Sequence, residues 1–149
     1  FLAIETIPNM TEATALVELL ADEFPDTEAY MSFTAQDSQS ISDGTLMTEV
    51  AKLCDSSKQI LAFGINCSRP AIISDLLKSS RTISQKPLVT YPNSGEIYHG
   101  ATQTWKSLPD NSHSLCENSQ VWHKLGAKIV GGCCRTRPED IKLLADKLK

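Results

Sequence analysis

Short apolar runs alternate along the chain with longer stretches in which apolar residues recur at helical spacing. This alternation is typical of βα units that build a parallel sheet. The apolar runs are continuous rather than interrupted at every second position, as expected of strands covered on both faces. We predict five strands, over residues 1–7, 28–35, 60–67, 87–91 and 127–134.

Amphipathic stretches between these strands predict helices. Apolar residues fall on one stripe over residues 10–24 and again over residues 44–54. A further helix is expected to begin near Pro70, because Ser68 can cap it and proline is tolerated in a first turn.

The last third of the chain is less regular. Residues 97–118 are polar, so we expect a long loop there, followed by a helix over residues 119–125. A final helix is well marked, since Thr136 and Glu139 have the spacing of a capping box and Pro138 lies in its first turn. The sequence therefore predicts five βα units.

Five units in 149 residues fit two architectures. They amount to about 30 residues each, close to the roughly 31 of an eight-unit TIM barrel of about 250 residues. They equally fit an open, doubly wound sheet of five strands. Periodicity alone does not choose between five-eighths of a barrel and a complete open sheet.

Composition excludes some classes of partner. The formal charge is −4, which argues against a nucleic-acid surface. No apolar run approaches the roughly 20 residues needed to cross a bilayer, so we expect no membrane partner. Five cysteines are an odd count for a disulfide framework, and we expect reduced thiols and a cytoplasmic protein. The chain opens at Phe1 inside an apolar run, so we expect it to be a piece of a longer protein.

Three cysteines end two of the predicted strands. Cys67 ends the third, and Cys133 and Cys134 end the fifth. Both architectures place their sites at the carboxyl ends of strands. Three thiolates suit a soft tetrahedral ion, most commonly zinc, and leave one coordination position for a substrate or water. Both neighbours can bind one ion only if the chain leaves strand geometry, which Gly131 and Gly132 make easy.

Two other readings of the cysteines stay open. Cys133 and Cys134 could form a vicinal disulfide in a thiol redox or thiol-sensing protein. Alternatively, the chain is a non-catalytic α/β binding module with buried cysteines, as we expect for Cys54 and Cys116 on the helical stretches.

Two more polar residues lie at predicted strand ends. Glu5 stands on an otherwise apolar strand, and an unpaired buried carboxylate is costly, so we expect it to face a ligand. Asn93 follows the fourth strand in an Asn-Ser-Gly sequence, which by itself indicates a turn.

Six strings of residues, in order along nearly the whole chain, resemble the homocysteine S-methyltransferase family, zinc-dependent thiol methyltransferases built on a parallel (βα)8 TIM barrel. They are ETIPN (5–9), SFT (32–34), DGT (43–45), GINC (64–67), YPNSGE (91–96) and GGCCRTRPEDI (131–141). The YPNSGE string favours the branch that uses S-methylmethionine.

The resemblance implies a site and a reaction. Cys67, Cys133 and Cys134 would bind Zn2+ with the homocysteine sulfur as fourth ligand. Glu5 would contact the amino group of homocysteine, and Asn93 would approach the metal when substrate is absent. The implied reaction transfers a methyl group from a sulfonium donor, S-methylmethionine or S-adenosylmethionine, to the thiol of L-homocysteine and forms methionine.

The resemblance also implies where the chain belongs. Its five strands would be the fourth to eighth of the barrel, so residues 1–149 would be the C-terminal portion of one barrel domain. The family's N-terminal half carries an Asp-Gly-Gly motif that has no counterpart here. A barrel without three strands exposes two edges, and we expect the isolated chain to be inactive.

Overall fold

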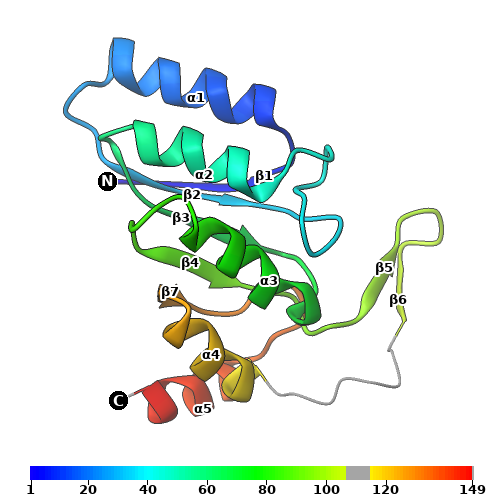
Figure 1. Cartoon of the computed structure of the whole chain (residues 1–149). Helices are drawn as coiled ribbons and strands as arrows, with labels where there is room; N and C mark the ends of the chain where they lie inside the picture. Colours follow the sequence, from blue (N-terminus) through cyan, green and yellow to red (C-terminus); the bar gives the residue numbers. More distant parts are fainter. Residues whose placement is uncertain (107–114, 149) are drawn as a thin grey trace.

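A five-stranded parallel sheet forms the centre of the chain (Figure 1). We describe it from a computed structural model, which describes residues 1–106 and 115–148. The strand order is β1-β2-β3-β4-β7, with every neighbouring pair parallel. The strands are β1 (Leu2–Ile7), β2 (Ala29–Phe33), β3 (Ile60–Asn66), β4 (Leu88–Tyr91) and β7 (Ala127–Val130). All five predicted strands are confirmed.

Helices alternate with these strands, and α1, α2 and α3 lie side by side along the sheet in Figure 1. The helices are α1 (Met10–Glu23), α2 (Met47–Ser56), α3 (Pro70–Arg81), α4 (Leu115–Lys124) and α5 (Pro138–Leu148). None of them, within the residues described, is both long and apolar enough to cross a bilayer.

The order of the strands separates the two architectures that periodicity left open. A doubly wound sheet reverses its strand order at a switch point. Here the sheet keeps chain order from one edge to the other, with no reversal. The doubly wound alternative is therefore wrong, and the strands are laid down as in successive units of a barrel wall.

The two faces of the sheet differ in chemistry. Met31, Phe33, Phe63 and Ile65 are fully buried and share one core cluster with residues of α1 to α4. Because side chains alternate along a strand, Tyr30 and the other intervening residues point to the opposite face. The helices thus cover one face, and the polar residues described below gather on the other.

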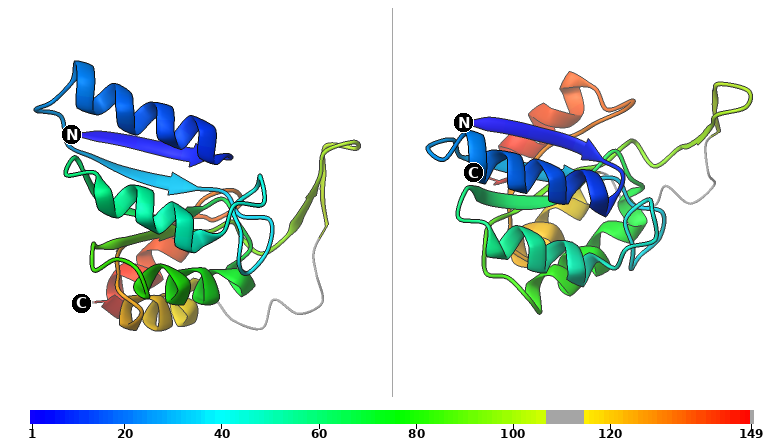
Figure 2. Two further views of the ribbon diagram at one scale, coloured as in Figure 1. Left: turned by 45° about the horizontal axis from the view of Figure 1, so that its top comes forward. Right: turned by 90° about the horizontal axis from the view of Figure 1, so that it is seen from above.

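The predicted loop over 97–118 contains a hairpin instead. Strands β5 (Ile97–His99) and β6 (Thr104–Lys106) pair antiparallel and project away from the sheet (Figures 1 and 2). Each of these strands is only three residues long, so neither contains an apolar run long enough to predict a strand. Helix α4 begins at Leu115, four residues before the predicted start. The remainder of the predicted loop, 107–114, lies outside the described residues.

Both predicted helix caps are wrong for the same reason. The residue that precedes α3 is Arg69, without a side-chain cap, because the Ser68 hydroxyl donates to Asn66 O and accepts from Ala35 N. Helix α5 begins at Pro138, so the residue that precedes it is Arg137 and not Thr136, whose hydroxyl donates to Cys133 O. In each case the hydroxyl of a serine or threonine is hydrogen-bonded within the loop that follows a strand, and the helix begins one residue later than the predicted cap requires.

Lys86 joins three backbone segments near the amino ends of the strands. Its Nζ donates to the carbonyl oxygens of Cys54 (2.8 Å), Ser57 and Ile60 (2.7 Å). Replacing Lys86 by methionine leaves these carbonyls without a donor, and we expect a loss of about 2–4 kcal/mol in the free energy of unfolding. Urea unfolding of the full-length protein measures it.

Lys78→Met is the matched control, because Lys78 pairs with Asp75 only on the exposed surface. Such pairs contribute about 0–1 kcal/mol. Equal effects of the two substitutions would contradict the role given to Lys86.

Candidate metal and substrate site

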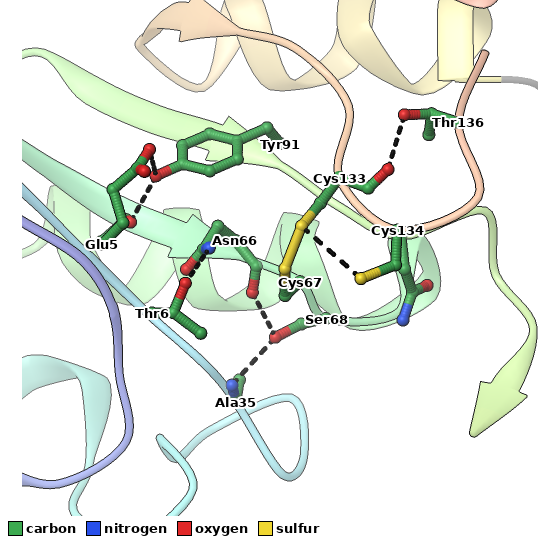
Figure 3. Close-up of a disulfide and its surroundings, with 12 residues drawn as sticks. Glu5, Thr6, Ala35, Asn66, Cys67, Ser68, Tyr91, Cys133, Cys134 and Thr136 are labelled. Atoms are coloured by element: carbon green, nitrogen blue, oxygen red, sulfur yellow. Dashed lines mark hydrogen bonds between the residues drawn. A yellow bond between two sulfur atoms is a disulfide. The ribbon is translucent and has the colours of Figure 1, made fainter. Parts of the chain in front are cut away.

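Three cysteine sulfurs converge from two strands that are not neighbours in the sheet. Cys67 directly follows β3, and Cys133 and Cys134 follow β7, with β4 in between. Their Sγ atoms all lie within 4.8 Å of one another, and those of Cys133 and Cys134 are 3.9 Å apart (Figure 3). Sulfurs around a tetrahedral zinc ion are separated by about 3.8 Å. The donor set therefore fits a soft metal ion.

Cys67 and Cys133 are joined by a disulfide in this structure, whereas Cys134 is free and exposed. The expectation of reduced thiols is thus not met for this pair. The vicinal bond between Cys133 and Cys134 is not formed either. A disulfide sulfur is not a thiolate, so the three-sulfur donor set is complete only when this bond is reduced.

Backbone hydrogen bonds bring the cysteine loops together. Cys67 N donates to Tyr91 O (3.1 Å), Cys133 N to Pro92 O (2.7 Å) and Ser94 N to Cys134 O (3.0 Å). The loop after β4 is therefore bound to both cysteine segments. An ion pair between Arg135 and Glu96 joins the same two loops.

The chain leaves strand geometry before the vicinal cysteines, so the fifth strand is shorter than the predicted 127–134, and the condition for both cysteines to bind one ion is met. Strand β7 ends at Val130, ahead of Gly131. At Gly132 a Cβ atom would overlap the side chain of Thr136. This glycine lets the chain turn tightly, so that both cysteines face Cys67.

Glu5 is held by two tyrosines on the face of the sheet that the helices leave open. The hydroxyls of Tyr30 (2.6 Å) and Tyr91 (2.7 Å) both donate to Glu5 Oε1. Ser32 Oγ lies 2.5 Å from the Tyr91 hydroxyl. Because the Tyr91 hydroxyl donates its one proton to Glu5, Ser32 is the donor in the hydrogen bond between Ser32 and Tyr91.

These contacts fix the charge of the cluster. The hydrogen bond from Tyr30, followed by that from Tyr91, lowers the pKa of Glu5. Burial, together with the nearby Glu5, raises the pKa of Tyr30. Burial also raises the pKa of Tyr91. At neutral pH the cluster is therefore one carboxylate with two neutral phenol donors.

The prediction that the Glu5 side chain is buried is wrong. It is exposed in this chain, because β1 lies at an edge of the sheet. Tyr30 and Tyr91 are site residues that the sequence did not predict. The signal for Tyr30 is that it lies two residues before Ser32 on the same strand, and the signal for Tyr91 is that it ends β4.

Asn93 lies in the loop after β4, nine-tenths buried. Its Oδ1 accepts from Gly95 N (2.9 Å), and its backbone N–H donates to Ser68 O (3.1 Å). The predicted turn is confirmed. Asn93 thereby lies beside the cysteine loops, with its side-chain oxygen engaged in the turn.

Comparison with known proteins identifies the family. The family model described as homocysteine S-methyltransferase matches residues 1–148. The chain belongs to this family. It is 45% identical over 144 residues to homocysteine S-methyltransferase YbgG of Bacillus subtilis, covering 97% of this chain and 45% of that protein. To the homocysteine S-methyltransferase of Escherichia coli it is 41% identical over 143 residues, 96% of this chain and 46% of that protein.

Solved structures of a family member resemble this chain in fold as well as in sequence. The metallated form of the E. coli homocysteine methyltransferase MmuM matches with a TM-score of 0.81 and 36% identity, covering 99% of this chain and 44% of that one. The oxidised form of the same enzyme matches with a TM-score of 0.81. This family member thus spans about half the length of the curated relatives it matches.

Proposed function

We propose that this chain carries the metal-binding part of an enzyme that transfers a methyl group from a sulfonium donor to the thiol of L-homocysteine and forms methionine. The observation that carries the proposal is the convergence of Cys67, Cys133 and Cys134, whose sulfurs lie within 4.8 Å of one another. Membership of the homocysteine S-methyltransferase family supports the reaction.

Zinc is the metal that we propose for the reduced site. Three cysteine thiolates without histidine suit a soft tetrahedral ion, and the E. coli relative has been solved in a metallated form. Cys67, Cys133 and Cys134 would hold the ion, which when bound would take up the homocysteine sulfur as a thiolate. Free thiols have a pKa near 8.5, so most of the acceptor would otherwise be protonated at neutral pH.

The chain's own residues contribute charge and position. Three cysteinates make the site electron-rich, which keeps the acceptor sulfur nucleophilic toward carbon. Glu5, kept ionised by Tyr30 and Tyr91, would bind the ammonium group of homocysteine and so orient its sulfur. We also propose that Asn93 approaches the metal in the absence of substrate.

Charge cancellation shapes the rest of the reaction. Thiolate and sulfonium both lose charge as the methyl group passes between them, so a site that excludes water favours the transfer. A thiol already deprotonated needs no general base, and we assign no catalytic acid or base.

We further propose that the chain forms about five C-terminal βα units of an eight-unit barrel in a longer cytoplasmic enzyme. The unreversed strand order and the partial coverage of the relatives support this proposal. The remaining units would supply the rest of the substrate site, and the isolated chain is then expected to be inactive.

A methyl-transfer assay on the full-length enzyme tests the function. Homocysteine is supplied with S-methylmethionine or S-adenosylmethionine, before and after complete removal of metal by a chelator. We expect methionine to form with at least one donor, to stop on chelation and to return on adding Zn2+. Activity untouched by complete metal removal would refute the mechanism.

The Cys67–Cys133 disulfide favours one second candidate, a thiol redox function. The disulfide also fits the methyltransferase, as its inactive, oxidised state. In that case a mild oxidant should release the metal and abolish methyl transfer. Excess thiol reductant with Zn2+ should then restore both, because the three thiolates are needed together. Metal content and methionine formation are followed in the same samples. Reversible oxidation in an enzyme that neither binds metal nor needs it would instead favour the redox function.

A further inference from the structure

The side chain of Asn66 has one end bonded and the other end without a partner. Asn66 is the last residue of β3, immediately before Cys67, and is only 1% exposed. Its Nδ2 donates to Thr6 Oγ1 (2.8 Å), whereas its Oδ1 has no hydrogen-bond partner among the residues described. A buried amide oxygen without a donor is costly, and this one lies beside a reactive site.

Asn66 lies between the metal-binding sulfurs and the Glu5 cluster. It adjoins Cys67 in sequence, and its register partner on β4 is Tyr91, which donates to Glu5. Its other bond reaches Thr6, the neighbour of Glu5. Figure 3 shows Asn66 between the Glu5–Tyr91 pair and Cys67. A substrate that reaches the sulfurs and Glu5 together would therefore pass Asn66.

Glu5 provides a second hydrogen-bond acceptor without a donor near Asn66. Both tyrosines donate to Glu5 Oε1, and within the described part of the chain no donor is bonded to Oε2. A carboxylate oxygen and a neutral amide oxygen suit an ammonium group, which has three N–H donors and no acceptor. A carboxylate ligand here would be repelled by Glu5.

We propose that Asn66 is a substrate-binding residue whose Oδ1 accepts a hydrogen bond from the α-ammonium group of the acceptor amino acid, beside Glu5. This inference rests on the proposed function and adds a residue to it. With two acceptors of different charge, the site would select thiols that carry an amine over thiols that do not.

Asn66 has a structural bond as well, which the test must separate from binding. Thr6 has a φ of 66°, an unusual conformation for a β-branched residue, at the point where the register of β1 shifts between Ile4 and Ile7. The hydrogen bond from Asn66 to Thr6 holds this irregular turn, and with it the direction of Glu5. Loss of that bond alone would turn Glu5 and so also weaken the two amine-bearing thiols. Thr6→Val removes the bond but keeps the Asn66 amide, so it measures this structural effect by itself.

Three thiols distinguish the two roles in the full-length, zinc-loaded enzyme. They are homocysteine, 4-mercaptobutanoate, which lacks the ammonium group, and 3-mercaptopropylamine, which lacks the carboxylate. Dissociation constants are measured by calorimetry without methyl donor. For Asn66→Ala we expect binding of both amine-bearing thiols to weaken about tenfold or more relative to 4-mercaptobutanoate, as for one hydrogen bond to a charged group.

Asn66→Asp keeps an acceptor oxygen and adds a negative charge. We expect it to raise the preference for the two amine-bearing thiols over 4-mercaptobutanoate, which decides the question even if Asn66→Ala does not fold. Thr90→Val is the matched control, since Thr90 also has a buried hydroxyl without a partner among the described residues but lies on the helix-covered side, in register with Ile65. The preference of the Thr90→Val variant for amine-bearing thiols should equal that of the unaltered enzyme.

Two outcomes would overturn the proposal. A change of preference in Asn66→Ala no larger than that in Thr6→Val, with no change of preference in Asn66→Asp, would leave only the structural bond to Thr6. Weakening confined to the two carboxylate-bearing thiols would mean that the amide binds the carboxylate. Methyl transfer by the unaltered enzyme is assayed separately, so failure of the proposed function is not confused with failure of this inference.

Discussion

Replacing Cys67 by alanine in the full-length enzyme is expected to abolish metal binding and to lower methyl transfer at least about a thousandfold. Cys67 is the one sulfur that β3 contributes, so its loss leaves only the pair from the loop after β7. Without the ion only a few per cent of the acceptor is thiolate at neutral pH, and its positioning is lost as well. Metal analysis and single-turnover assays measure the two effects.

Cys116→Ala is the control for this substitution. Cys116 lies on α4, where its Sγ lies 3.6 Å from Leu143 O, away from the three-sulfur cluster. We expect full metal content and nearly full activity in this variant. Metal retained by Cys67→Ala at the level of the control would contradict the assignment of the ligands.

Replacing Gly64 by alanine is expected to destabilise the protein by about 3 kcal/mol or more. A Cβ atom at this position in β3 would overlap the backbone carbonyl of Val89 in β4. Backbone cannot move aside like a flexible side chain, so β3 and β4 would have to separate where they position Asn66 and Tyr91. Urea unfolding, together with recovery of soluble protein, measures the loss.

Gly100→Ala provides the matched comparison. No atom lies within 4 Å of a Cβ built at Gly100, in the turn of the projecting hairpin. Its effect should stay within about 0.5 kcal/mol, as for surface substitutions in general. A tolerated Gly64→Ala would show that the two strands are not held as closely as described.

The parallel sheet was predictable because burial on both faces leaves a strong signal in the sequence. The apolar run over 60–67 corresponds to β3, which ends one residue earlier, at Asn66. Strand order was not predictable, since the same runs fit a barrel or an open sheet. The β5–β6 hairpin was not predictable because its pairing lies outside the apolar core. The helix caps were wrongly predicted because the hydroxyls of Ser68 and Thr136 make hydrogen bonds within the loops before the helices.

The site was predictable to the extent that strand ends in a parallel sheet share one edge. That rule placed Cys67 near Cys133 and Cys134, and the structure brings them together. Contacts across strands were not predictable, because they depend on register. Tyr30 and Tyr91 meet at Glu5 only through the pairing of β1 to β4, which no single segment encodes.

The bond between Cys67 and Cys133 closes a ring of chain, since the two residues are 66 positions apart. The projecting β5–β6 hairpin lies inside that ring. A protease that cuts the hairpin would therefore leave two pieces still covalently joined through sulfur. On a denaturing gel without reductant the nicked chain would migrate as one species, and it would separate into two bands only once the sulfurs are reduced.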